Sequence, residues 1–219
     1  MFIFYLVMQD FSNVSFKSRI NIVGMKAFDK IPKGKYIHYF SDASNANILK
    51  SDTFSTVNVR TCTGGGLSSK NELTALGFHL WDCEESSLFK KYVDFIKDSF
   101  PQVDSALIVG SKKTEFAKKS VKNFLCMKKM LQKKCSNLSW FQTITKQGGE
   151  VDFKYSKADD TWTLRLLEWR SNQEKPDVVN SLKKLLDFFE EISISPNDRL
   201  FINGKEVTEK QAPQIFRKR

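Results

Sequence analysis

Residues 54–82, FSTVNVRTCTGGGLSSKNELTALGFHLWD, decide how this chain is expected to fold. Ser55–Cys62 is rich in β-branched residues and alternates in polarity, which predicts a strand. The glycine triplet Gly64–Gly66 is expected to break that strand, and Leu76–Trp81 predicts a second, short one. The stretch therefore indicates two strands joined by a flexible glycine loop.

Alternate side chains of a strand share one face. The polar face of the predicted strand would carry Thr56, Asn58, Arg60 and Cys62, and the core face Val57, Val59 and Thr61. Cys62 would then end the strand beside the loop, within reach of His79 on the next strand. Because a thiol needs a base to become a thiolate and imidazole is the usual one, the two form a candidate catalytic pair. The alternative is a small buried thiol and a satisfied interior histidine.

Composition narrows the class of protein. The chain has 219 residues, of which 41% are hydrophobic, so it is expected to fold as one large domain or one domain with extensions. Its net charge of +10 favours acidic partners. Lys112–Lys134 holds nine Lys against one Glu. It predicts a long basic helix, either a solvated face or a docking surface for an acidic partner.

Several classes of function are excluded by spacing. The glycine triplet lacks the pattern of a phosphate-binding loop, and the cysteines form no C-x-x-C pair or zinc-like cluster. Scattered cysteines indicate thiols in a reducing compartment. The apolar segment Met1–Met8 is shorter than the roughly 20 residues of a membrane-spanning helix, and it lacks the features of a signal peptide. We therefore expect no metal, no organic cofactor and no transmembrane segment.

The remaining elements alternate between strands and helices. Ser41–Asp52 is expected to be a loop or a short helix. Helices are predicted at Ser87–Phe100, Lys112–Lys134 and Pro176–Ile192; strands at Phe16–Val23, Lys35–Phe40, Ser105–Gly110 and Leu138–Thr145; and hairpins at Val151–Trp169 and Leu200–Val207. This order predicts an α+β fold with a central, mainly antiparallel sheet flanked by helices.

The spacing of three residues resembles a known family. Thr56, Cys62 six positions later and His79 seventeen beyond that match the spacing in CheD-like glutamine deamidases of bacterial chemoreceptors. Downstream, Ala106–Ser111 resembles the apolar strand of that family, and Gly148–Phe153 its paired strand. Related cysteine deamidases occur among bacterial toxins of the cytotoxic necrotizing factor type. The chain departs from the family in placing Arg60 and Thr61 before the cysteine and its glycines after it.

The resemblance implies a fold and a chemistry. It implies a catalytic core at residues 53–170, preceded by N-terminal strands and an extension at 1–52 and followed by a helix and hairpin at 171–219. It also implies a protein-glutamine deamidase with Cys62 as nucleophile, His79 as base and Thr56 as the orienting hydroxyl. The substrate would be a protein with an accessible glutamine. The location would be the cytoplasm, or a host cytosol after secretion as an effector.

Other functions remain open on the same residues. A thioester that accepts amines would make the chain a transglutaminase, and the same pair could serve a cysteine protease. A non-enzymatic binding module would use the basic helix and would not depend on Cys62. Nucleic-acid binding is not expected, because no recognised motif accompanies the charge. Trp81 is a candidate wall of the site, while His38, Cys83, Cys126 and Cys135 are given no catalytic role.

Overall fold

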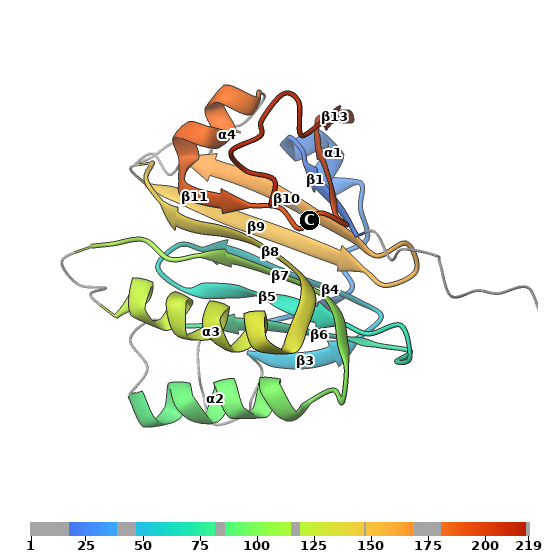
Figure 1. Ribbon diagram of the computed structural model, residues 1–219, viewed down its shortest axis with the longest axis vertical. Coiled ribbons are helices and arrows are strands. Elements are labelled where there is room, and N and C mark those ends of the chain that lie inside the picture. The colour runs from blue at the N-terminus through green and yellow to red at the C-terminus, as the bar shows by residue number, and fades with distance from the viewer. Residues whose placement is uncertain are drawn as a thin grey trace, which may run out of the picture.

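The chain forms an α+β structure with two mixed sheets and four helices in the part that is described (Figure 1). The computed structural model describes residues 18–38, 47–81, 86–114, 119–146, 148–168 and 181–217. The predicted fold class is confirmed, and most strand pairings are antiparallel, as expected. The strands nevertheless divide between two sheets instead of forming one central sheet.

The first sheet, sheet A, combines strands from all parts of the chain. Its order is β13-β12-β1-β10-β9-β4-β2. The strands are β1 (Arg19–Ile22), β2 (Lys35–Tyr36), β4 (Thr53–Val59), β9 (Gly149–Ser156), β10 (Thr161–Glu168), β12 (Arg199–Ile202) and β13 (Lys205–Val207). Strand β1 lies between β10 and β12 and is parallel to both. The segments expected as N-terminal and C-terminal extensions therefore share one sheet with the expected core.

The second sheet, sheet B, has the order β11-β8-β7-β5-β6-β3. Its strands are β3 (Ile48–Ser51), β5 (Thr63–Ser68), β6 (Ala75–Leu80), β7 (Val103–Gly110), β8 (Cys135–Ile144) and β11 (Phe189–Ser193). Strands β7 and β8 are parallel and are connected through helix α3 (Ser120–Lys134). This crossover places α3 on one face of the sheet.

Two hydrophobic cores flank sheet B. The inter-sheet core lies between the sheets and includes Phe54, Phe141, Phe153 and Trp162. The outer core lies between sheet B and the helices α2 (Ser86–Asp98) and α3. Helices α1 (Met25–Asp29) and α4 (Leu182–Phe188) lie on the sheet A side of the molecule (Figure 1). Sheet B is therefore covered on both faces.

The glycine triplet does not form a loop, contrary to the prediction. Gly64–Gly66 lies inside the buried strand β5, between β6 and β7. Its glycines are required by packing. A Cβ on Gly66 would lie 2.4 Å from the Leu76 carbonyl oxygen and 2.9 Å from the Trp162 ring. Larger side chains would therefore collide with the neighbouring strand and the inter-sheet core.

We expect Gly66→Ala to lower the free energy of unfolding by about 2–4 kcal/mol, because the added methyl meets backbone and packed rings. Gly204→Ala is the matched control. Gly204 has a φ of +80°, but a Cβ at this position would meet no atom within 4 Å, so only the left-handed backbone penalty of about 1 kcal/mol should apply. Urea unfolding measures both variants. Equal losses would show that crowding in β5 is unimportant.

Three further expectations are corrected by the fold. Ile48–Ser51, predicted as loop or helix, is an edge strand paired with β6. The predicted helix Pro176–Ile192 is helical over Leu182–Phe188 and continues as strand β11; its first residues, to Asn180, lie outside the described part. The basic helix begins at Ser120, and residues 111–114 before it are not helical. None of the described helices is long and apolar enough to cross a membrane.

Candidate active site

A β-bulge in strand β4 sets the position of Thr56. The pairing of β4 with β9 shifts between Thr56 and Val59. Asn58 within the bulge has a φ of 61°, and its backbone N–H donates to Asp152 Oδ1 at 2.9 Å. The additional residue lets Thr56 and Val59 both face the interior, where each is fully buried.

The predicted assignment of faces is therefore wrong for Thr56, which was expected on the polar face and is fully buried. Val59 is buried and Arg60 is exposed, as predicted, and β4 ends at Val59. Cys62 lies in a bend between β4 and β5 and is 5% exposed, not on a polar face. Asn58 was the one local signal of the bulge, because asparagine is depleted in strands and enriched at positive φ, but the residue alone does not specify a shift in pairing.

Thr56 and His79 form a hydrogen bond between the two sheets. Thr56 Oγ1 lies 2.9 Å from the Ile37 carbonyl oxygen and 2.7 Å from His79 Nδ1. A carbonyl oxygen can only accept, so the Thr56 hydroxyl donates to Ile37 and His79 Nδ1–H donates to Thr56. This arrangement assigns the Nδ1–H tautomer and leaves the lone pair of the imidazole on Nε2.

Cys62 lies on the same face of sheet B as His79. Gly64 is directly opposite His79, and a Cβ on Gly64 would lie 2.9 Å from Val59 and Phe153 of sheet A. Cys62 precedes Gly64 by two residues and belongs to the same inter-sheet core. Its carbonyl accepts from the Ser111 backbone N–H at 2.9 Å, which extends the pairing of β5 with β7 by one residue.

Continued one residue before β5, the strand register places Cys62 at a position diagonal to His79 on β6. Backbones in that relation are about 7–8 Å apart, a distance that larger side chains span. Gly64 contributes no side chain between the thiol and the imidazole, and Val59 and Phe153 of sheet A occupy the space over it. Trp81, which directly follows the last residue of β6, is half-buried and packs against the inter-sheet core.

Burial determines the protonation state of this site. His79 is fully buried, and the loss of solvation lowers its pKa to about 3. The resting imidazole is therefore neutral at physiological pH. Since Thr56, Cys62 and His79 are at most 5% exposed, a substrate reaches Cys62 only if neighbouring chain segments move.

The other cysteines and His38 lie elsewhere. Cys126 is exposed on α3. Cys135 is buried, and the loss of solvation raises the pKa of its thiol to about 12. His38 is exposed, with its ring edge-on to Tyr36 at 4.9 Å. Cys83 lies outside the described residues.

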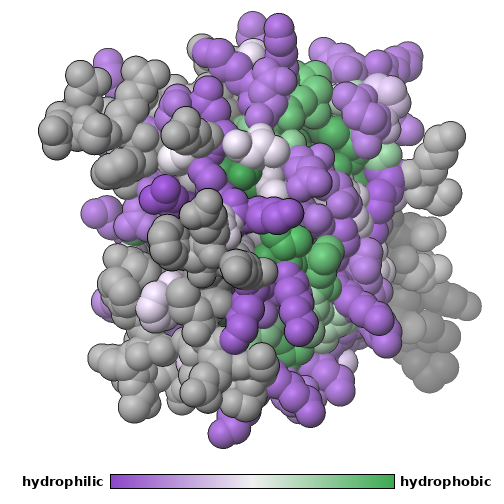
Figure 2. All heavy atoms as spheres, turned by 90° about the vertical axis from the view of Figure 1, so that its left-hand side faces the viewer, coloured by the Kyte–Doolittle hydropathy of each residue, from purple (hydrophilic) through white to green (hydrophobic). Residues whose placement is uncertain are grey.

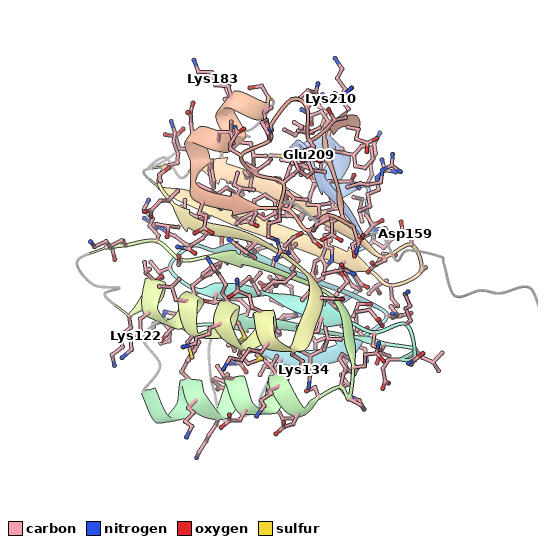
Figure 3. The ribbon with its side chains drawn as sticks, in the orientation of Figure 1. Lys122, Lys134, Asp159, Lys183, Glu209 and Lys210 are labelled. Carbon is pink, nitrogen blue, oxygen red and sulfur yellow. The ribbon has the colours of Figure 1, made fainter. Side chains whose placement is uncertain are left out.

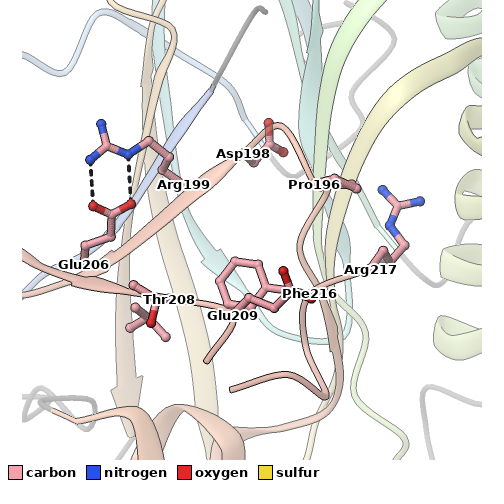
Figure 4. A pocket seen from close by; sticks show the side chains of 9 residues that line it. Pro196, Asp198, Arg199, Glu206, Thr208, Glu209, Phe216 and Arg217 are labelled. Atoms are coloured by element: carbon pink, nitrogen blue, oxygen red, sulfur yellow. Dashed lines mark hydrogen bonds and ion pairs between the residues drawn. The ribbon is translucent and has the colours of Figure 1, made fainter. Parts of the chain in front are cut away.

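A second group of charged residues, which line a hollow, was not predicted from the sequence. A hollow of about 520 Å³ is lined by Asp198, Arg217 and the Arg199–Glu206 ion pair, among others (Figure 4). Asp198 is 7% exposed and accepts a hydrogen bond from Ser139 Oγ at 2.6 Å. Burial raises its pKa to about 7. Sequence patterns indicate a turn at residues 195–198, but burial of the carboxyl group depends on distant strands.

No group of three His, Cys, Asp or Glu side chains that could hold a metal occurs among the described residues. No protein-family model matches the chain, and no curated protein matches it either. The class that fold and geometry define is an α+β protein of two facing mixed sheets, with a Thr–His hydrogen bond between the sheets and a buried cysteine in the same inter-sheet core.

Proposed function

We propose that the chain is a cysteine-dependent protein-glutamine deamidase of the CheD-like type, acting as an effector or toxin-like enzyme. The observation that carries the proposal is the hydrogen bond from His79 Nδ1–H to Thr56 Oγ1 at 2.7 Å. It holds the imidazole in the tautomer that a general base needs, with the basic lone pair on Nε2. Cys62, on the same sheet face, is the thiol nearest to it in strand register.

The proposed reaction is acyl transfer. Because the pKa of His79 is lowered to about 3, the resting pair is a thiol and a neutral imidazole. The proton passes from Cys62 Sγ to His79 Nε2 as the sulfur attacks the carboxamide carbon of a glutamine. The proton then leaves with the departing ammonia, and a thioester remains. Water, losing a proton to His79, hydrolyses the thioester to glutamate and restores the thiol.

Thr56 would act as a positioning residue in this reaction. Its hydroxyl is oriented by donation to the Ile37 carbonyl, so its lone pairs face His79 Nδ1–H. When Nε2 takes up a proton, the resulting imidazolium remains bonded to Thr56. This support is the role that a third group plays in hydrolytic triads.

The test is mass spectrometry of a whole lysate treated with wild type or with Cys62→Ala. Wild type is expected to increase the mass of particular glutamine-containing peptides by about one dalton, since OH replaces NH₂, and Cys62→Ala is expected to abolish the change. Cys126→Ala is the matched control, because that thiol is exposed on α3 and its loss should have no effect.

Other outcomes distinguish the rival functions. Cleavage of peptide bonds that depends on Cys62 would identify a protease, and amine adducts on glutamine would identify a transglutaminase. If Cys62→Ala changes no activity, the buried thiol and the Thr56–His79 bond are structural. The chain would then be better described as a binding module.

A further inference from the structure

The groove between the first turns of α2 and α3 has an unusual lining. A hollow of about 260 Å³ is lined by Phe89, Lys90, Val93, Lys119, Lys122, Asn123 and Cys126. Phe89 and Val93 are 5% and 7% exposed and supply apolar surface. The side of the molecule at which both helices begin is shown in Figure 2, where hydrophilic side chains cover most of the described surface. The groove therefore combines an apolar floor with charged walls.

The walls of the groove carry positive charge that the described residues do not neutralise. Lys90, Lys119 and Lys122 are exposed, and no described carboxylate lies within ion-pair distance of them. Lys128, farther along α3, differs: it is 3.0 Å from Glu191 and lies over the Trp140 ring. Lys122 extends from the start of α3 in Figure 3. Three lysines without a described carboxylate partner therefore line the groove.

A buried donor in the same groove provides an independent indication of a ligand. Asn123 is 9% exposed, and its side-chain Nδ2 is buried without an acceptor among the described residues. A buried amide that lacks a hydrogen bond costs about 1–3 kcal/mol. A ligand oxygen placed in the groove would accept from this group. Because the surrounding side chains are ammonium groups, the favoured acceptor is a carboxylate.

We propose that this groove binds an acidic peptide segment of a partner protein, with one apolar side chain over Phe89 and Val93 and a carboxylate accepting from Asn123. The volume suits a single leucine-sized or phenylalanine-sized side chain, whereas a nucleic-acid strand would need a longer basic track with stacking rings. The groove lies on the outer-core side of sheet B and Cys62 lies on the inter-sheet side. The proposal is therefore independent of the enzymatic function.

The probe is a fluorescein-labelled peptide with one leucine flanked by two glutamates on each side, and its matched peptide has alanine in place of leucine. Binding is measured by anisotropy titration at about 150 mM salt, where distant charges are screened. The leucine peptide is expected to bind at least about fivefold more tightly than the alanine peptide, because burying a leucine side chain contributes more than about 1 kcal/mol to binding. Equal affinity of the two peptides would overturn the proposal.

Two variants locate the binding. Lys122→Glu, in the groove, is expected to weaken binding about tenfold or more. Lys133→Glu makes the same charge change at an exposed position of α3 outside the groove, and it should have a much smaller effect. Asn123→Asp replaces the donor by an acceptor at equal size, and it should weaken binding as much as Lys122→Glu. If Lys133→Glu is as harmful as Lys122→Glu, the attraction is a general property of the basic face and the groove is not the site.

Cys126 offers a local readout. Its thiol is exposed in the groove, while Cys62 and Cys135 are buried. In a Cys83→Ser background, the leucine peptide is expected to slow modification of Cys126 by a thiol reagent in proportion to occupancy. Binding without protection of Cys126 would place the peptide elsewhere. Tighter binding of duplex DNA or of anionic phosphatidylserine vesicles than of the peptide would overturn the assignment of the partner class.

Discussion

Replacing His79 by alanine is expected to reduce deamidation as severely as replacing Cys62, by a factor of 10³ or more, on the order of losing the base of a nucleophilic pair. The physical reason is that a thiol that keeps its proton is a poor nucleophile, and His79 is the base that would remove this proton. The measurement is the initial rate of ammonia release from a substrate identified in the lysate experiment.

The double variant Cys62→Ala/His79→Ala tests whether the two residues act as a unit. We expect it to be no slower than either single variant, because each substitution alone removes the same acyl-transfer step. Additive losses would mean that His79 contributes by some route other than activating Cys62. Circular dichroism of each variant establishes that the sheets remain folded.

Thr56 should show a milder and chemically specific effect. Thr56→Val keeps the shape but removes the hydroxyl between Ile37 and His79, and it should lower the rate by about 10–100-fold, as for the loss of a positioning contact. Thr56→Ser restores the hydroxyl and should recover most of the activity. A merely structural role would predict that Thr56→Val loses thermal stability, because the buried His79 Nδ1–H is left without its acceptor, but keeps the wild-type rate at temperatures where it remains folded.

The sequence was informative where local pattern and packing agree. The apolar and alternating residues of β6, the amphipathic pattern of α2 and the hairpin of β9 and β10 all lie close to their predicted bounds. In each, neighbouring residues decide both the element and its buried face. The spacing of Thr56 and His79 likewise predicted two residues that the structure joins by a hydrogen bond.

The errors arose where distant strands decide local structure. Gly64–Gly66 adopts an extended conformation because β6 and β7 pair with it on both sides, against the tendency of glycine toward loops. Phe189 and Ile192 fit a helical period, but pairing of this segment with β8 makes it a strand. The placement of Cys62 in the same inter-sheet core that His79 faces depends on strand register, which no local pattern in the sequence specifies.

The dependence of stability on pH is expected to reveal two buried groups that act in opposite directions. His79 has an ordinary pKa of 6.5 and a folded pKa of about 3. Below pH 6.5 the His79 imidazole binds a proton in the unfolded chain but not in the folded chain. His79 therefore lowers the free energy of unfolding as pH falls from 6.5 toward 3. Asp198 has an ordinary pKa of 3.8 and a folded pKa of about 7. Between these values the folded chain keeps a proton that the unfolded chain loses, so Asp198 lowers stability as pH rises.

The two contributions overlap between about pH 4 and pH 6.5, where each changes the free energy of unfolding by about 1.4 kcal/mol per pH unit with opposite sign. They should therefore largely offset each other in the wild type. In Asp198→Asn only the His79 contribution remains. The free energy of unfolding of this variant relative to wild type should therefore increase steadily from pH 4 to pH 7. His79→Gln leaves the Asp198 contribution, so its stability relative to wild type should decrease over the same range.

Urea unfolding at half-unit pH steps measures both differences. Comparing each variant with wild type at the same pH cancels the titration of groups that do not interact with the substituted residue. Asp160, whose pKa is also raised by burial, interacts with Asp198, so its titration is part of the Asp198→Asn difference. Asn at position 198 can still accept the hydrogen bond from Ser139, which lies 2.6 Å from the carboxylate, so the comparison isolates the charge. Between pH 3.8 and about pH 7, the difference in the free energy of unfolding between Asp198→Asn and wild type should change by on the order of 4 kcal/mol. A difference that is independent of pH would mean that Asp198 is solvated in the folded chain, and the hollow beside Arg217 would then be wet and open to ions.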